Sequence, residues 1–297
     1  MTEPFTGGEG EARSGEAALL TEDLSQADFE RFAGLITQRL GIRMVEAKRT
    51  MLQGRLARRI RQLRLSGFEE YRHYLFHSPQ GEEEFVHFAD AVTTNKTDFF
   101  REPQHFDYLV KEALPALDGS LHSRLWVAKV WSAGCSSGEE AWTLAMVLSE
   151  YGKARPGFEF SILATDVSTR VLARAREATY PREAAEALPP ALRQRYFLSS
   201  RDASLKLVRV APELRAKVTF EHLNFMDRAY GVKTVFEAIF FRNVMIYFDK
   251  PTQEAVVNRL CQHLRPGGYL FVGHSESLAG LAVPLRPAAV AVYRKSG

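Results

Sequence analysis

A loop of small residues after an apolar run could hold a nucleotide-like ligand. Residues 130–140 read Val-Trp-Ser-Ala-Gly-Cys-Ser-Ser-Gly-Glu-Glu, so a predicted strand at 126–133 leads through two glycines into a predicted helix at 139–151. Small side chains let backbone N–H groups and a helix N-terminus approach a ligand closely, as in doubly wound folds that bind nucleotides at the carboxyl edge of the sheet. An ordinary tight turn between strand and helix is the alternative interpretation.

Asp166 is placed to complete such a binding site. It directly follows the next predicted strand, residues 158–165. Because neighbouring parallel strands end at the same edge of a sheet, its carboxylate would lie beside the glycine loop and could accept both hydroxyls of a ribose. Asp166 could also cap the helix predicted from Ser168, and the two roles are compatible. The loop and the acid together predict a pocket for a nucleoside.

Nucleophilic catalysis is the rival chemistry for the same loop. Gly134, Ser136 and Gly138 match the G-x-S-x-G nucleophile elbow of α/β-hydrolases, and Asp227 and His274 follow in the order of a catalytic triad. However, the loop follows the first strand rather than a late one, and two acids directly after it would oppose a developing oxyanion. The loop cysteine has neither a histidine nor a cation nearby in sequence to activate its thiol. Both nucleophiles are therefore disfavoured.

The segments around the loop indicate two structural units. From about residue 21 to 92, apolar residues recur at three- and four-residue steps, which predicts an all-helical domain. After a connecting stretch at 93–125, short apolar runs alternate with helical periodicity, which is typical of a parallel α/β sheet. The further predicted strands are 217–220, 235–241 and 268–273, and the further predicted helices are 168–178 and 251–264. Residues 189–216 fit neither pattern, so we expect a small antiparallel β insertion there.

The composition and the first residues limit the class of protein to which the chain can belong. With 45% hydrophobic and 25% charged residues, the chain can form one or two globular domains. Residues 1–20 lack the apolar core of a signal peptide, and we expect a disordered tail. No stretch approaches the roughly 18 apolar residues of a membrane span, and two cysteines are too few for a disulfide framework or a metal cluster. We therefore expect a soluble, cytoplasmic, monomeric protein without membrane insertion or a bound metal.

Positive charge is concentrated on the amphipathic helix predicted at 47–65. Seven basic residues and no acidic one lie between Lys48 and Arg64, although the formal charge of the whole chain is only +3. The candidates for binding an acidic partner are Lys48, Arg55, Arg58 and Arg59. No aromatic residues are interleaved with them to stack on bases, so a nucleic-acid partner is disfavoured. A solvated helix face without a partner is the other interpretation.

Four segments resemble, in the same order, the motifs of the CheR methyltransferases, which methylate chemotaxis receptors. They are residues 93–101 (Thr-Thr-Asn-Lys-Thr-Asp-Phe-Phe-Arg), 132–140 (Ser-Ala-Gly-Cys-Ser-Ser-Gly-Glu-Glu), 241–248 (Phe-Arg-Asn-Val-Met-Ile-Tyr-Phe) and 272–278 (Val-Gly-His-Ser-Glu-Ser-Leu). The helical segment with its basic helix also looks like the amino-terminal domain of the family. The resemblance implies a doubly wound, Rossmann-like methyltransferase domain at 126–297 that uses S-adenosylmethionine and releases S-adenosylhomocysteine.

The resemblance also implies roles for individual residues. Contacts to the cofactor would come from Asn95, Thr97, Arg101, Ala133, Glu139 or Glu140, Asp166, Asn224, Phe225, Arg242 and Asn243. Asp166 would bind the ribose, and Asn224 with Phe225 would lie by the adenine. One of the two adjacent glutamates would face the methionine ammonium, and spacing alone leaves both open. Arg101 and Tyr247 are the candidate catalytic residues, because their hydrogen bonds could orient a substrate carboxylate.

The implied reaction needs no general base. A sulfonium methyl is already electrophilic, and a glutamate with a pKa of about 4.3 is already ionised at neutral pH. Catalysis then consists of aligning oxygen, carbon and sulfur in a dry site where opposite charges cancel. We expect a protein-glutamate O-methyltransferase that acts in chemotaxis adaptation on receptor cytoplasmic helices, which the basic helix would help to dock. The alternative is an inactive S-adenosylmethionine-binding sensor or scaffold. Residues 198–204 lack the glycines expected of an insertion that docks a receptor peptide.

Overall fold

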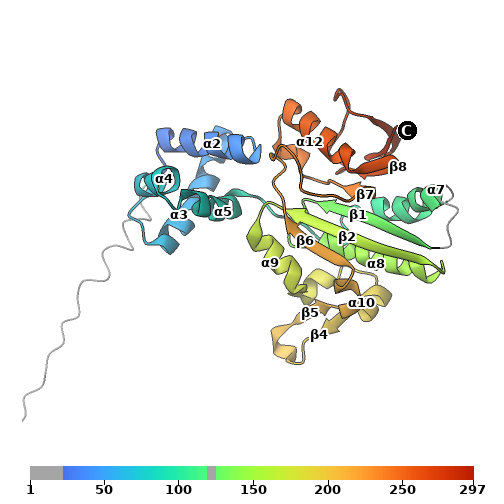
Figure 1. The fold of residues 1–297 in the computed structure, drawn as a ribbon. Coiled ribbons are helices and arrows are strands. Elements are labelled where there is room, and N and C mark those ends of the chain that lie inside the picture. Colours follow the sequence, from blue (N-terminus) through green and yellow to red (C-terminus); the bar gives the residue numbers. More distant parts are fainter. Residues whose placement is uncertain (1–22, 119–124) are drawn as a thin grey trace, which may run out of the picture. The chain divides into compact units, whose positions relative to one another are not determined.

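The computed structural model describes residues 23–118 and 125–297. It divides into two compact units (Figure 1): a helical unit, which comprises residues up to Gln38 and Met44–Thr93, and a sheet unit, which comprises Arg39–Arg43 and Thr94–Gly297. The tail predicted at 1–20 lies outside the described residues. No helix in the described ranges is long and apolar enough to span a bilayer.

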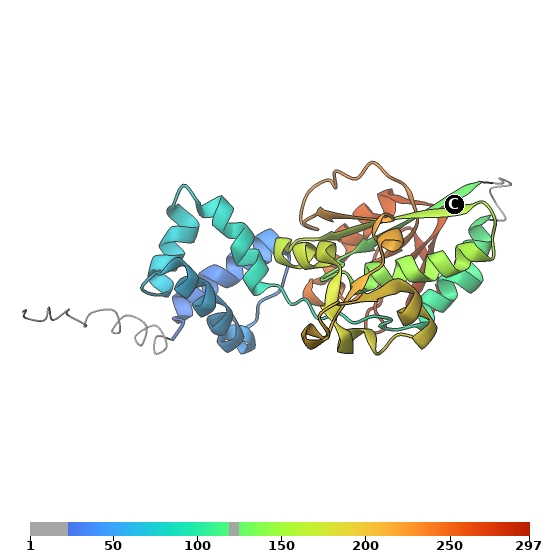
Figure 2. The ribbon, with the colours of Figure 1, turned by 90° about the horizontal axis from the view of Figure 1, so that it is seen from below.

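The described part of the helical unit contains four α-helices and one short 3₁₀ turn, coloured blue to cyan in Figure 2. They are α2 (Gln26–Leu40), η1 (Glu46–Lys48), α3 (Arg49–Leu63), α4 (Phe68–His77) and α5 (Gly81–Val92). Leu52, Leu56 and Ile60 of α3 are fully buried. Phe32 of α2 packs with ring centroids 5.9 Å from both Tyr71 and Phe88. Helix α3 ends where Arg64 adopts a left-handed conformation. The all-helical prediction is confirmed.

The sheet unit contains a mixed sheet whose strand order places a crossover at its centre. Seven strands of the described chain run in the order β6-β2-β1-β7-β8-β10-β9. Their bounds are β1 (Trp126–Ala133), β2 (Phe158–Asp166), β6 (Val218–His222), β7 (Phe236–Phe240), β8 (Leu264–Phe271), β9 (Leu285–Ala289) and β10 (Val292–Lys295). The first five are parallel, and β10 pairs antiparallel with β8 and β9. Because the chain continues from β1 first to one side and later to the other, ligand binding is expected at the carboxyl ends of β1 and its neighbours.

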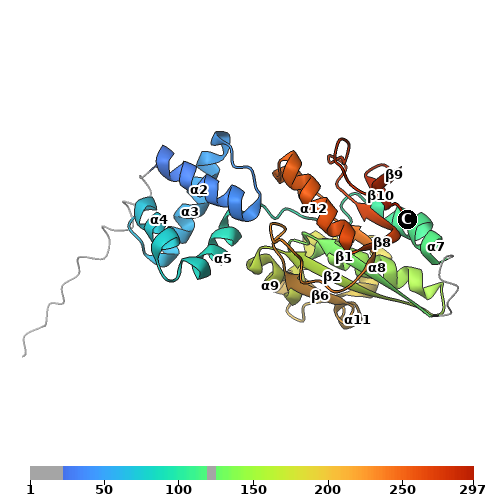
Figure 3. The same ribbon diagram turned by 45° about the horizontal axis from the view of Figure 1, so that its top comes forward.

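Helices cover both faces of this sheet (Figure 3). Helix α8 (Glu139–Lys153) contributes to one buried apolar cluster and α12 (Lys250–Gln262) to the other. Helix α9 (Thr169–Glu177) follows β2, with Ser168 as its N-cap. These three helices and the five parallel strands were predicted. The last parallel strand begins four residues earlier than expected, because Leu264 already pairs with Phe236 of β7, before a shift of register across the Pro-Gly-Gly segment.

Residues 104–118, predicted as part of a connecting stretch, are instead helical. They form α6 (Gln104–Tyr108), a π-helical turn η2 (Leu109–Ala113) and α7 (Leu114–Asp118). Phe106 stacks on Phe240 of β7 with ring centroids 5.7 Å apart, and Leu109 is fully buried. Burial of this apolar stripe against the sheet gives the segment a fixed place.

A second, three-stranded antiparallel sheet confirms the predicted insertion. Its order is β3-β5-β4. Its elements are β3 (Thr179–Pro181), η3 (Arg182–Ala185), α10 (Pro190–Tyr196), β4 (Phe197–Ser199), η4 (Ala203–Leu205), β5 (Leu207–Val210) and α11 (Pro212–Arg215). The first strand precedes the predicted start at residue 189, since three residues are too short to show an alternating pattern.

Candidate functional site

The loop after β1 is confined so closely that two of its positions require glycine. Gly134 has a φ of +87°, and a Cβ there would lie 2.6 Å from Val244 Cγ2. Gly138 has a φ of +96°, and a Cβ there would meet three side-chain atoms at 2.9–3.1 Å. The Thr165 carbonyl accepts the N–H groups of Gly134 and Cys135 at 2.8 and 2.9 Å. The bare backbone of the loop is therefore held at the end of β1.

Asp166 ends β2 against this loop, as the sequence predicted. Its Oδ2 accepts the Ser136 N–H and its Oδ1 accepts the Ser168 N–H, both at 2.9 Å. Ser168, rather than Asp166, caps α9, because its hydroxyl accepts the Val171 N–H at 3.3 Å. Asp166 is buried in the protein and carries a carboxylate at the sheet edge where α/β proteins bind ligands.

The segment 94–102 crosses the same sheet edge and presents Arg101. The Ser136 hydroxyl donates to the Asn95 carbonyl at 2.9 Å, and the Phe100 N–H donates to Thr143 Oγ1 at 3.2 Å. Phe100 and Glu102 on either side of Arg101 have φ values of 53° and 55°. Left-handed conformations at non-glycine residues cost about 1–2 kcal/mol each, so surrounding contacts must impose this kink.

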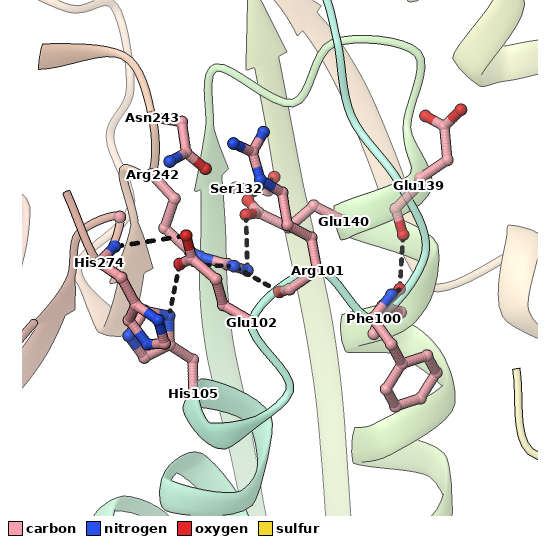
Figure 4. A network of polar contacts seen from close by, with 12 residues as sticks. Phe100, Arg101, Glu102, His105, Ser132, Glu139, Glu140, Arg242, Asn243 and His274 are labelled. Atoms are coloured by element: carbon pink, nitrogen blue, oxygen red, sulfur yellow. Dashed lines mark hydrogen bonds and ion pairs between the residues drawn. The ribbon is translucent and has the colours of Figure 1, made fainter. Parts of the chain in front are cut away.

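Arg242, just after β7, supplies those contacts (Figure 4). Its Nη2 pairs with Glu102 Oε2 at 3.0 Å and also donates to the Arg101 carbonyl, while its Nη1 pairs with Glu140 Oε2 at 3.3 Å. The Ser132 hydroxyl donates to the other Glu140 oxygen at 2.7 Å. Because the Arg242 side chain is only 2% exposed, this guanidinium is a buried link between three segments distant in sequence.

The two adjacent glutamates of α8 have different partners. Glu140 belongs to the Arg242 network, whereas Glu139 accepts the Ser137 hydroxyl at 2.7 and 3.0 Å. Burial raises the pKa of Glu140, which Arg242 and Ser132 oppose. Burial also raises the pKa of Glu139, which Ser137 opposes. Burial acts in the same direction on Glu102, but Arg242 and the His274 N–H outweigh it, so the pKa of Glu102 is lowered.

Glu102, His105 and His274 form a polar cluster beside Arg242 that the sequence did not predict. One potential metal-ligand atom of each lies within 4.8 Å of the others, and the imidazole rings of His105 and His274 meet edge to face at 4.7 Å. Burial, followed by the charge of Arg242, lowers the pKa of His105 to about 4. The Glu102 oxygen nearest His105, at 3.5 Å, is the one that pairs with Arg242. A divalent cation would therefore compete with a buried guanidinium, so we interpret the cluster as part of the Arg242 network.

The loop between β7 and α12 carries two further candidates. Asn243 is left-handed, with a φ of 59°, and Tyr247 ends the 3₁₀ turn η5 (Met245–Tyr247), where it is half-buried. Phe225 packs edge to face on Phe241 at 5.0 Å, near Gly134, and Asn224 Oδ1 accepts the Met226 N–H at 3.0 Å. Ala133 is buried at the end of β1, and Thr97 is half-buried in the crossing segment. Of these residues, Phe225 is the one that lies against the glycine loop.

The nucleophile interpretations find no support in this geometry. The Ser136 hydroxyl donates to a backbone carbonyl, and no histidine is its partner within the described ranges. Cys135 is buried, and desolvation followed by the charge of Asp166 raises the pKa of its thiol. A thiol so protonated is a poor nucleophile.

The four predicted cations of α3 and its N-cap have different environments within the helical unit. Arg59 makes a bidentate pair with the buried Glu84, at 2.9 and 2.6 Å, and Glu84 also accepts the Tyr71 hydroxyl at 2.8 Å. Arg55 donates to the carbonyls of Val92 and Thr93. Lys48 is half-buried and Arg58 is exposed. Arg59 and Arg55 therefore stabilise the unit itself.

Comparison with known proteins identifies the family of the chain. Residues 95–291 match the family model described as "CheR methyltransferase, SAM binding domain". Residues 27–93 match the model described as "CheR methyltransferase, all-alpha domain". The chain belongs to the CheR methyltransferase family. It is accordingly an S-adenosylmethionine-dependent methyltransferase, as the four motifs predicted.

Curated CheR relatives match over most of their length. The chemotaxis protein methyltransferase of Klebsiella aerogenes is 41% identical over 87% of this chain and 86% of its own. The protein of that name from Salmonella typhimurium is 40% identical over 90% of this chain and 91% of its own. The chemotaxis protein methyltransferase of Borreliella burgdorferi is 36% identical over 88% of this chain and 92% of its own.

Several residues of this CheR site were missed at the sequence level. Ser132, Glu102 and His105 lie within or beside the recognised motifs, but no spacing pattern marks them. Glu102, for example, meets Arg242 across 140 positions of sequence. Only the fold brings such pairs together.

Proposed function

We propose that this CheR enzyme transfers the methyl group of S-adenosylmethionine to glutamate side chains on the cytoplasmic helices of chemoreceptors. The products are glutamyl methyl esters, which set receptor output during chemotaxis adaptation, and S-adenosylhomocysteine. The enzyme would act as a monomer in the cytoplasm. The observation that carries the proposal is the convergence of a loop with two confined glycines, the Asp166 carboxylate and the Arg101–Arg242 network at one sheet edge.

The residues at this edge fit a charged nucleoside. Asp166 would accept the ribose hydroxyls while its backbone bonds hold it against the loop. Asn224 and Phe225 would lie along the adenine, and Ala133 with the glycines would leave room for the thioether segment. Asn95, Thr97 and Asn243 would complete the lining. When bound, the cofactor supplies the electrophilic methyl group.

Between the adjacent glutamates, we assign the methionine ammonium to Glu140. Glu140 shares the Arg242 network with Arg101, whereas Glu139 is buried against Ser137. A carboxylate beside Arg242 could receive the ammonium while Arg242 receives the methionine carboxylate. Charges of both signs would then be paired in a dry pocket.

Arg101 and Tyr247 would orient the substrate glutamate. The Arg101 guanidinium donates to the Lys96 carbonyl at 3.2 Å and is half-exposed, so it remains accessible to an incoming carboxylate. The glutamate is already ionised at neutral pH, and these two residues need only align it with the methyl–sulfur bond. Attack joins an anion to a cation, so excluding water favours the transition state.

The exposed basic face of α3 would guide the receptor. Arg59 pairs with Glu84, and Arg55 donates to the Thr93 carbonyl. An acidic helix would therefore lie against the exposed Arg58, Arg61 and Arg64, with the half-buried Lys48 at the edge of this face. Complementary charge raises the rate of encounter and sets register.

Transfer of radiolabelled methyl to receptor cytoplasmic fragments tests the proposal. Label that alkali releases as methanol is expected from the full chain, and Arg101→Ala should abolish it without lowering the unfolding temperature. Arg286→Ala, which removes an exposed arginine of β9, is the matched control and should retain activity. Alkali-stable label would contradict glutamyl esterification. Binding of S-adenosylhomocysteine without any transfer would instead favour a sensor or scaffold.

A further inference from the structure

Glu276, in the loop after β8, is a buried carboxylate without a cationic partner. Its residue is 8% exposed, and no lysine or arginine of the described ranges forms an ion pair with it. Burial raises its pKa, and backbone N–H groups oppose that shift. Burying an acid costs free energy unless hydrogen bonds replace its water, so the partners of this carboxylate show what it stabilises.

Those partners are backbone N–H groups from two loops. Glu276 Oε2 accepts the N–H of Gly273 at 2.6 Å and that of Asn243 at 2.8 Å. Its Oε1 accepts the Ile246 N–H at 3.2 Å. Asn243 and Ile246 belong to the loop between β7 and α12, whereas Gly273 directly precedes the Glu276 turn. One side chain therefore fastens the loop after β7 to the loop after β8.

The loop after β7 needs such an external support. Its only regular element is the three-residue turn η5, and Asn243 is left-handed. Whereas Glu276 accepts N–H groups of this loop, Gln253 of α12 donates to its carbonyl groups. The Gln253 Nε2 donates to the carbonyls of Met245 and Phe248 at 2.9 and 3.1 Å. Glu276 thus provides the acceptors and Gln253 the donors that regular secondary structure would otherwise supply.

Close packing also couples the two loops. A Cβ at position 273 would stand 2.4 Å from Asn243 Nδ2 and 3.0 Å from the Asn243 backbone nitrogen. The absence of a side chain there lets Asn243 approach Gly273, and the shared Glu276 oxygen joins their N–H groups. A shift of either loop would separate Asn243 from Gly273 and break a hydrogen bond to the Glu276 oxygen that they share.

We infer that Glu276 is a positioning residue for methyl transfer, which holds the loop bearing Arg242, Asn243 and Tyr247 in its working conformation. This inference rests on the proposed function, in which the first two bind the cofactor and Tyr247 orients the acceptor. Glu276 itself touches none of the reacting groups in this account. Its effect is geometric, and displacement of a site residue by about 1 Å can lower turnover about 100-fold.

Two substitutions test the inference in the full chain. Glu276→Ala removes all three acceptor contacts, and Glu276→Gln keeps an oxygen for the Gly273 and Asn243 donors but turns an NH₂ group toward Ile246. Glu254→Gln is the matched control, since Glu254 accepts the Ala282 N–H at 2.8 Å on the surface. The measurements are kcat, KM for a receptor fragment, unfolding temperature and hydrogen exchange of the peptide 241–248.

The expected result separates positioning from stability. At a temperature well below unfolding, kcat should fall roughly 100-fold in Glu276→Ala and about tenfold in Glu276→Gln. KM for the receptor fragment should stay within about twofold, because α3 governs docking. Exchange of 241–248 should accelerate in both variants, and Glu254→Gln should match the parent chain.

Three outcomes would overturn the inference. If Glu276→Gln folds and its kcat stays within twofold of that of the parent chain, Glu276 has no positioning role. If the unfolding temperature falls while kcat is unchanged, Glu276 has only a structural role. Unchanged exchange of 241–248 shows that the loop is not held by this carboxylate. If the parent chain itself transfers no alkali-labile methyl, the proposed function fails, and exchange together with S-adenosylhomocysteine affinity still decides whether Glu276 holds the loop.

Discussion

Replacing Arg242 by methionine should destabilise the protein far more than loss of a surface arginine. The substitution removes the guanidinium from between Glu102 and Glu140, whose side chains are 15% and 13% exposed. Breaking a buried pair by removing one partner costs about 3–5 kcal/mol, because the remaining charge stays buried without compensation. The Arg101 carbonyl also loses its donor. We expect a decrease of about 3–5 kcal/mol in the free energy of unfolding.

A double-mutant cycle with Glu140→Gln isolates the pair. Glu140→Gln removes the carboxylate that Arg242→Met would leave unpaired, so the double variant should be more stable than the sum of the single changes predicts by about 1–3 kcal/mol. Urea unfolding followed by circular dichroism at pH 7.5 measures each corner. Arg155→Met is the control, since the Arg155–Asp118 pair is 40% and 36% exposed, and should cost under about 1 kcal/mol. Additivity, or an Arg242→Met cost equal to the control, would refute the network.

Three further changes probe other parts of the account. Gly138→Ala should lower the free energy of unfolding by about 2–4 kcal/mol through strain and overpacking and abolish S-adenosylhomocysteine binding. The control is Gly231→Ala, where the added Cβ meets no atom within 4 Å, and this change should be nearly neutral. Urea unfolding measures the stability and calorimetry the binding. His105 has a folded-state pKa of about 4 against an ordinary 6.5, so the unfolded chain binds the extra proton and stability falls as the pH drops from 6.5 to 4. His105→Leu should remove up to about 3 kcal/mol of that pH dependence in paired urea titrations, and parallel curves would contradict it. Arg58→Glu should slow receptor methylation several-fold at low salt but not at high salt, with unchanged cofactor affinity; equal slowing at both salt concentrations would exclude electrostatic guidance.

Local patterns predicted the glycine loop, Asp166 and the parallel strands because each depends on neighbours in sequence. Gly134 and Gly138 adopt backbone angles that favour glycine, so their residue type alone indicates a tight loop. Asp166 directly follows an apolar run, so its place at the end of a strand can be predicted from its neighbours in sequence. The helical segment at 104–118 escaped because Pro115 lies in it and because its π turn disturbs the regular spacing of apolar residues.

Long-range pairing limited the prediction of the site. The sequence shows that α3 is basic, but not that Arg59 pairs with Glu84 while Arg58 faces solvent. In the same way, Glu102 and Glu276 are ordinary acids until the fold places one on Arg242 and the other on two backbone loops. Such contacts join residues far apart in the chain, and no local periodicity encodes them.

Calorimetric titration of S-adenosylhomocysteine into the full chain tests the central claim most directly. One molecule should bind per chain, with affinity at least tenfold weaker in Asp166→Ala, since each hydrogen bond to a charged group contributes about 1.5–3 kcal/mol. Absence of binding to the parent chain, or equal affinity in Asp166→Ala, would contradict the assignment of the nucleoside pocket to this edge of the sheet.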